Sequence, residues 1–100
     1  EFFAPPIFQY GHSQGRGASI IGGYVYRGRR LGGLYGVYLY ADFVDQSIWG
    51  LRYEDGKVVS NDFLATVPLP VSFGEDENGE VYIVGFGKGW IYTFEGLPDD

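Results

Sequence analysis

The stretch VYLYADF at residues 37–43 recurs as VYIVGF at residues 81–86, 44 positions later. The next strand-like stretch, IWGL at residues 48–51, recurs as IYTF at residues 91–94, 43 positions later, so the intervening loop differs by one residue. A repeat of this length, with about four short strands in each unit, is typical of β-propeller blades. A β-sandwich also has short, closely spaced strands, but it need not repeat its own sequence. The repeat therefore favours a propeller over a sandwich.

The composition agrees with an all-β fold. The chain of 100 residues is 45% hydrophobic and 19% aromatic, and it contains 17 Gly, 9 Tyr and no Met. Aromatic and β-branched residues favour strands, whereas Gly gives a helix little support. The sequence also lacks the long apolar run of a membrane-spanning helix. We expect strands joined by tight turns and no membrane span.

Turn signals set the expected strand boundaries. The dipeptides Asp55-Gly56 and Asn78-Gly79 predict hairpins, because both tolerate the positive φ that such turns need. Strands are expected at residues 19–26, 37–42, 47–53, 58–67, 71–74, 80–85 and 90–94, with a short edge strand at residues 7–10.

These strands divide the chain into units. Residues 19–67 are expected to form one complete four-stranded antiparallel blade, and residues 68–96 three strands of a second blade. Residues 1–18 provide a lead-in with the outer strand of a preceding blade, and residues 97–100 a tail. About two blades leave two apolar faces open, which predicts a fragment of a larger propeller that associates with other blades or with identical copies.

The charge of the chain restricts its partners. A formal net charge of −6 argues against nucleic acid, because phosphate binding needs a positive surface. Arg27, Arg29 and Arg30 form the one basic cluster, and in so acidic a chain we expect a solvated loop there. The sequence has no Cys, which excludes disulfides and thiolate metal sites.

Few residues have the pattern of a metal site. His12 is the one His, and a metal needs several convergent ligands, so a hydrogen-bonding loop anchor is expected. Asp42 and Asp45 have the oxygen ligands that calcium prefers, but Asp42 is expected to cap its own loop through backbone N–H groups. The acidic run EDENGE at residues 75–80 lacks the spacing of an EF-hand loop, and we expect a solvated hairpin.

Two further patterns have a structural interpretation. The run GFGKG at residues 85–89 lacks the phosphate-loop pattern and predicts a tight strand connection. Aromatic residues could provide a platform for stacking sugars, but we expect most of them to fill the core between blades. They are Tyr24, Tyr26, Tyr35, Tyr38, Tyr40, Trp49, Tyr82, Trp90 and Tyr92.

Three motifs in order resemble one protein family. They are SIIGGYVYRG at residues 19–28, YADF at residues 40–43 followed by Ile48-Trp49, and SFGEDENGEVY at residues 72–82. Together they resemble the C-terminal blades of the glucose/sorbosone dehydrogenase-like propellers, in the branch that includes the hedgehog-interacting protein. The resemblance implies a six-bladed propeller, periplasmic or extracellular, whose catalytic members use pyrroloquinoline quinone (PQQ) and calcium to oxidise sugars. Three copies of a two-blade chain would complete such a ring as a homotrimer.

The catalytic residues that the resemblance implies do not match this sequence. Catalytic members carry a Lys after the strand that matches residues 37–42, and here that place falls near Val44. Their Arg pair falls at Pro68 and Pro70, and Pro has no side-chain donor. Their general base is a His from an early blade, outside this chain. We therefore expect no catalytic, cofactor-binding or metal-binding residues in this chain, with PQQ and calcium confined to a parent protein.

A candidate binding face remains. In a propeller the loops at residues 11–18, 42–46, 67–70 and 85–89 would share one end of the blades. They contribute the polar residues His12, Arg16, Asp42, Asp45, Gln46 and Lys88. We expect a scaffold or interaction module, with carbohydrate as one candidate ligand of this face. The alternative is a part of a PQQ- and calcium-dependent aldose dehydrogenase whose catalytic residues lie on other blades.

Overall fold

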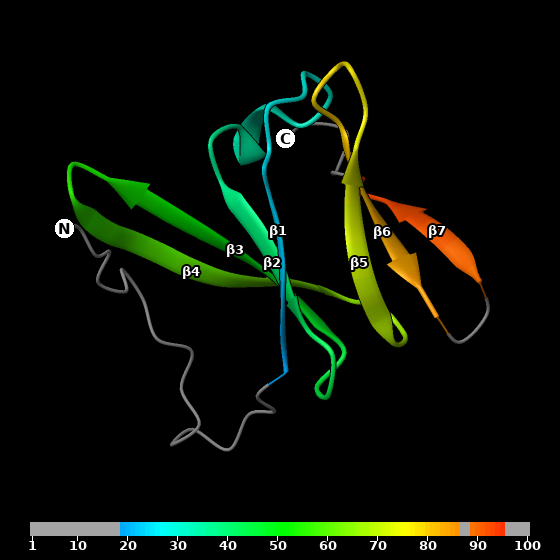
Figure 1. Cartoon of the computed structure of the whole chain (residues 1–100). Helices are drawn as coiled ribbons and strands as arrows, with labels where there is room; N and C mark the ends of the chain where they lie inside the picture. The colour runs from blue at the N-terminus through cyan, green and yellow to red at the C-terminus, as the bar shows by residue number, and fades with distance from the viewer. Residues whose placement is uncertain (1–18, 87–88, 96–100) are drawn as a thin grey trace, which may run out of the picture.

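Seven strands and one turn of 3-10 helix make up the regular structure of the described residues (Figure 1). The computed structural model describes residues 19–86 and 89–95. The strands are β1 (Ile20–Val25), β2 (Tyr38–Asp42), β3 (Ser47–Glu54), β4 (Lys57–Thr66), β5 (Pro70–Glu75), β6 (Val81–Gly85) and β7 (Trp90–Thr93). One turn of 3-10 helix, η2 (Gly32–Leu34), interrupts the β1–β2 loop. The expected all-β class is confirmed, while the strand predicted at residues 7–10 lies outside the described residues.

Two antiparallel sheets contain these strands in chain order. The first sheet has the order β1-β2-β3-β4 and the second has β5-β6-β7, and the described strands do not close into a ring. Asp55 and Gly56 both have positive φ, 53° and 78°, which confirms the two-residue hairpin between β3 and β4. The hairpin predicted at Asn78-Gly79 also forms, with Gly79 at φ 82° and its N–H donating to the Asp76 carbonyl. None of the helices described here is long and apolar enough to cross a membrane.

The pairing register repeats between the two sheets. Tyr40 pairs with Trp49 in the first sheet, and Ile83 pairs with Tyr92 in the second, so each partner recurs 43 residues later. The expected offsets of 44 residues for the first strand and 43 residues for the second cannot both hold, because the two ladders require offsets that add up to 86 residues. An equal offset of 43 residues for both strands satisfies this, whereas the shared Val-Tyr residue types had favoured 44 for the first. In a strand a slip of one residue moves every side chain to the opposite face.

The same register shows how the sheets stack. Ala41 and Ile48 of the first sheet pack with Ile83 of the second in one buried cluster. Paired residues of an antiparallel ladder point to the same face, so Val84 and Ile91, which stand 43 residues after Ala41 and Ile48, point away from the first sheet. Ile91 is accordingly 68% exposed. The two sheets stack front to back, both turned in the same direction.

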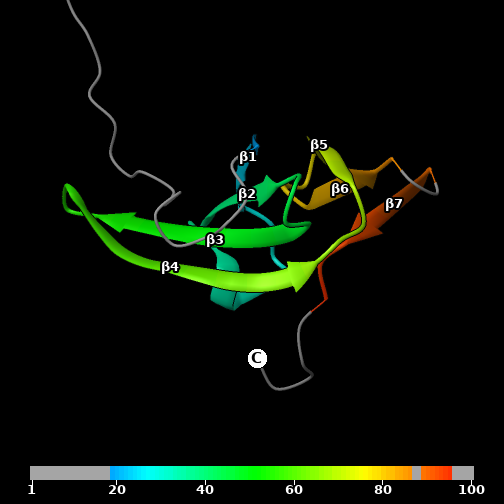
Figure 2. The same ribbon diagram turned by 90° about the horizontal axis from the view of Figure 1, so that it is seen from below.

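The sheets come closest at their first strands. β1 and β5 lie side by side, whereas β4 and β7 lie farther apart, so the sheets splay like the sides of a wedge (Figure 1). Gly23 permits this approach, since a Cβ there would meet the Leu39 carbonyl and, at 3.2 Å, the Phe73 ring. Seen from below, the end of β4 leads directly into β5 (Figure 2). A short connection, residues 67–69, therefore links the last strand of one sheet to the first strand of the next.

Candidate functional site

Three of the loops predicted to share a face do meet at one end of the sheets. The Phe43 amide donates to the Ser19 carbonyl at 2.8 Å, and the Val67 amide donates to the Gln46 carbonyl at 3.1 Å. The Phe86 amide donates to the Leu69 carbonyl at 2.9 Å. Residues 42–46, 67–70 and 85–86 therefore form one bonded group of loops. His12, Arg16 and Lys88 of the predicted face lie outside the described residues.

Asp42 builds its own loop. Its side chain is fully buried, and Oδ1 accepts from the amides of Val44 at 2.9 Å and Asp45 at 3.1 Å. This is the capping geometry expected from the sequence. The second oxygen, Oδ2, is buried and has no hydrogen-bond partner within the described part of the chain. The Asp45 side chain is exposed, so the two carboxylates are not held together as a pair.

Gln46 ties the first sheet to the connection between the sheets. Its backbone has φ 56°, and its Oε1 accepts from the Leu69 amide at 2.9 Å. Leu69 itself has φ 47°, which non-Gly residues seldom adopt. The Gln46 side chain therefore stabilises a strained connection.

The described residues do not fit the quinone or the calcium ion that the resemblance implies. Pro68 and Pro70 have no side-chain donors, and Val44 is an exposed apolar residue. The oxygens of Asp42 and Gln46 that have partners already accept backbone N–H groups. Among residues 19–86 and 89–95, no group of three His, Cys, Asp or Glu side chains is placed to hold a metal.

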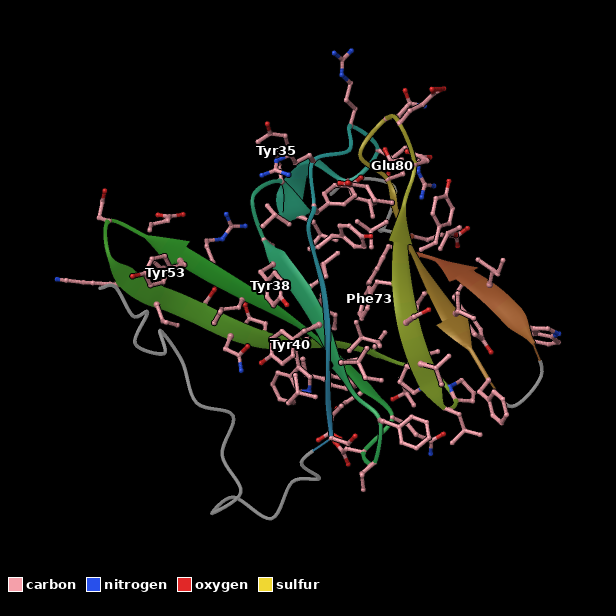
Figure 3. All side chains as sticks on the ribbon, viewed as in Figure 1. Tyr35, Tyr38, Tyr40, Tyr53, Phe73 and Glu80 are labelled. Atoms are coloured by element: carbon pink, nitrogen blue, oxygen red, sulfur yellow. The ribbon has the colours of Figure 1, made fainter. Side chains whose placement is uncertain are left out.

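The most elaborate polar cluster lies at the opposite end of the sheets, around Glu80. We call Tyr26, Arg29, Arg30 and Glu80 the Glu80 cluster. Glu80 Oε1 accepts from the Tyr26 hydroxyl at 2.8 Å and from Arg30 Nε at 3.4 Å. Its Oε2 accepts from the backbone amides of Arg29 at 3.0 Å and Arg30 at 3.3 Å. Figure 3 shows Glu80 beside the β1–β2 loop, where a residue of the second sheet binds a loop of the first.

Two glycines allow the turn and the loop to meet. A Cβ at Gly28 would overlap the Glu80 carboxylate, and a Cβ at Gly79 would lie 2.7 Å from the backbone carbon of Arg27. Asp76 fixes the turn itself, because its Oδ1 accepts from the amides of Asn78 and Glu80, and its Oδ2 accepts from the Tyr82 hydroxyl at 2.9 Å. These hydrogen bonds therefore hold the turn in one conformation and fix the position of Glu80 directly before β6.

Ionisation supports this arrangement at neutral pH. Burial opposes the charge of Glu80, but hydrogen bonds from Tyr26, from the Arg30 and Arg29 amides and from the Arg30 side chain outweigh it and lower the pKa of Glu80. Burial, followed by the bond to Glu80, raises the pKa of the Tyr26 phenol. Glu80 is therefore ionised while Tyr26 keeps the proton that it donates.

The sequence did not reveal the Glu80 cluster. The run at residues 75–80 was expected to be a solvated hairpin, and for Glu80 that expectation is wrong, because Glu80 is only 8% exposed. The three arginines of the basic loop are exposed, as expected for a solvated loop, although the Arg30 side chain also bonds Glu80 and the Phe94 carbonyl. One sequence signal was available: Glu80 directly precedes the buried residue Val81 of β6.

The aromatic residues are divided among three places, and only two of the nine pack between the two described sheets. Of the nine named, Tyr26 and Tyr92 join the clusters between the sheets. Tyr38, Tyr40 and Trp49 lie on the far face of the first sheet with Leu51 and Val58. Tyr35 is 60% exposed and Trp90 55%, while Tyr24 is also exposed and Tyr82 bonds Asp76.

A groove opens near the Glu80 cluster where the sheets diverge. It has a volume of about 510 Å³ and mainly apolar walls. The β1–β2 loop, β4 and the residues around the end of β7 line it through Leu31, Gly33, Leu34, Leu64, Ala65, Thr93, Phe94 and Glu95.

No protein-family model matches the sequence, and no solved structure matches the fold.

Proposed function

We propose that the chain is a non-catalytic segment of a β-propeller, made of two successive blades, that serves as a scaffold or interaction module. The observation that supports this most is the uniform 43-residue register of β2–β3 and β6–β7, combined with front-to-back stacking. Successive propeller blades repeat one unit around an axis, so each blade turns the same face toward its successor. A sandwich has no such requirement, because its two sheets face each other across one core.

The splay of the sheets also supports a propeller. Blades radiate from an axis, so their innermost strands approach one another while their outer strands separate. β1 and β5 would be the innermost strands, and the connection at residues 67–69 would return the chain from the outer strand β4 to the next inner strand. The Glu80 cluster would then lock neighbouring blades at the correct angle.

The loop residues support a scaffold rather than a catalyst. Two polar residues of the predicted face have described contacts, Asp42 and Gln46. Asp42 Oδ1 and Gln46 Oε1 accept hydrogen bonds from backbone amides of the loops. A catalytic group needs free reach toward a substrate. We infer that the polar loop residues described here hold the blades in place.

The open face of the second sheet would receive the next blade. By register this face carries Tyr82, Val84 and Ile91. The partner is the remaining part of the propeller, and in its absence we expect the chain to self-associate through this face. Light scattering tests this: Ile91→Lys should lower the measured mass, whereas Val59→Lys, at an exposed position of the outer strand β4, should not. A wild-type chain that is monomeric and folded at high concentration would contradict the open face.

The absence of catalysis is tested separately. The full chain is mixed with PQQ and calcium, quinone binding is followed by absorbance, and dye reduction is measured with aldoses. A heat-denatured sample is the matched control. We expect no saturable binding and no turnover above that control. Saturable binding with turnover would overturn the scaffold proposal and favour the sugar dehydrogenase alternative.

A further inference from the structure

The outer edges of the two sheets differ in how they are protected. β1 and β5 lie beside each other, so the outer strands are β4 in the first sheet and β7 in the second, and no described strand lies beyond either (Figure 1). The β3–β4 ladder skips Val59 and Leu64, so β4 is irregular at both places. Such bulges, and charged residues such as Lys57 and Asp62, discourage a sheet edge from pairing with another chain. The β4 edge is therefore protected.

The outer edge of β7 has neither kind of protection. Its sequence, WIYT at residues 90–93, contains no charged residue and no Pro. These residues pair with β6 in an unbroken register, and the Ile91 and Thr93 side chains are exposed. A regular, uncharged edge strand is a template for pairing with a further strand. Of the two outer edges, β7 is therefore the one suited to accept a partner strand.

The repeat shows what kind of strand fits this edge. At the offset of 43 residues, β7 corresponds to β3, and β4 fills the equivalent edge of β3 in the antiparallel direction. Phe63 of β4 lies opposite Trp49 of β3, and Trp49 corresponds to Tyr92 of β7. A strand that pairs with β7 in the same way carries an aromatic residue opposite Tyr92.

The groove between the sheets lies beside the same edge. Leu64 and Ala65 of β4 form one wall, and Thr93 and Phe94 at the end of β7 form another. Tyr92 points toward the first sheet, because it packs against the cluster between the sheets. Paired residues of an antiparallel ladder point to the same face, so a side chain opposite Tyr92 also points toward the first sheet and its groove. The volume of about 510 Å³ is sufficient for an aromatic ring.

From these observations we propose that β7 accepts an extended partner segment of the β4 type, which pairs antiparallel to β7 and inserts an aromatic side chain into the groove. Main-chain hydrogen bonds supply the affinity of such a contact, and the groove selects the side chain opposite Tyr92. The segment SNDFLAT at residues 60–66 of β4 shows the chemistry expected of the partner. This inference rests on the repeat that supports the proposed function, but it concerns the edge of the second sheet and not its open face.

The probe is a synthetic peptide with the sequence KVVSNDFLATV, residues 57–67 of this chain. The peptide carries a fluorescent label, and its anisotropy is followed as the full wild-type chain is added. We expect saturable binding. Phe63→Ala in the peptide should weaken binding by about tenfold, because the aromatic anchor is lost. A scrambled peptide of the same composition should not bind. Absence of saturable binding, or equal binding by either control peptide, would overturn the proposal.

NMR locates the peptide on the chain. The chain is isotope-labelled and the peptide is not, so that NOEs between the two can be selected. We expect NOEs from the phenylalanine ring of the peptide to the methyl groups of Leu64 and Ala65 in the chain, and shifts of the β7 amide signals. Shifts of the β3 amides instead would show that the peptide displaces the chain's own β4. NOEs confined to Val84 and Ile91 would place the peptide on the open face. Either of these last two results overturns the proposal.

The edge and the open face can be tested apart. Light scattering of the chain without peptide tests the open face, whereas the peptide tests the edge of β7. A chain that stays monomeric and still binds the peptide at β7 would contradict the open face and support the edge. A chain that self-associates but binds no peptide would support the open face and contradict the edge.

Discussion

Replacing Glu80 tests whether its cluster holds the two sheets together. The carboxylate accepts from the Tyr26 hydroxyl and from the amides of Arg29 and Arg30, as well as from the half-exposed Arg30 side chain. Each buried donor left without an acceptor costs about 1–3 kcal/mol. The bond to the exposed Arg30 side chain adds little, because such pairs are screened by solvent. Glu80→Ala should therefore cost about 3 kcal/mol, a large part of the stability of so small a domain.

Glu80→Gln is the more informative change. It preserves the side-chain volume and one acceptor oxygen, but it places an NH₂ group against other donors. We expect a loss of about 1–2 kcal/mol, measured by urea unfolding followed through Trp fluorescence. Glu77→Gln, an exposed change in the same turn, is the matched control and should lie within about 0.5 kcal/mol of wild type.

The pH dependence gives a second readout of the same variant. The pKa of Glu80 is lowered below its ordinary value of 4.5, so its contribution is complete above that pH and is lost as the pH falls through the folded-state pKa. The gap between wild type and Glu80→Gln should therefore be largest at neutral pH and shrink in acid. Equal stability of Glu80→Gln and Glu77→Gln at neutral pH, or a gap that is unchanged in acid, would refute this reasoning.

Two further predictions concern the same interface. Gly79→Ala and Gly56→Ala both place a side chain at positive φ, 82° and 78°, but only the side chain at residue 79 would meet the Arg27 backbone. Urea unfolding should therefore show Gly79→Ala to be at least about 1 kcal/mol more destabilising than Gly56→Ala. Equal losses of stability would contradict the close approach of Gly79 to Arg27. The raised pKa of Tyr26 means that its contribution is present below pH 10 and is lost as pH rises through the folded-state pKa. Alkaline unfolding should accordingly be shallower in Tyr26→Phe than in wild type, and identical slopes would count against the buried phenol.

Local sequence signals predicted the strands well. Asp55-Gly56 and Asn78-Gly79 mark hairpins by their own backbone preferences, and the strands that flank them lie within one or two residues of the expected bounds. The loop-capping role of Asp42 was also predicted, because an Asx turn depends only on neighbours in sequence.

Features that depend on packing could not be read from the sequence. In the sequence nothing distinguishes Glu80 from its exposed neighbour Glu77. Glu80 is buried because the β1–β2 loop, more than fifty positions away in sequence, packs against it. The two offsets of the repeat were inconsistent by one residue, because Val37-Tyr38 matches Val81-Tyr82 by residue type, while only the ladders show which residues pair. The sequence also did not show that aliphatic residues, Leu39, Ala41, Ile48, Val81 and Ile83, provide much of the core between the two described sheets.

Methyl NOEs measure the direction in which the two sheets stack. The chain is prepared with labelled Ile, Leu, Val and Ala methyl groups, and the contacts of the two isoleucines of the second sheet are compared. Front-to-back stacking predicts NOEs from Ile83 to the Ala41, Ile48 and Val67 methyls, and none from Ile91 to that group. NOEs from Ile91 to Ile48, with none from Ile83, would show the second sheet turned over and would contradict the account.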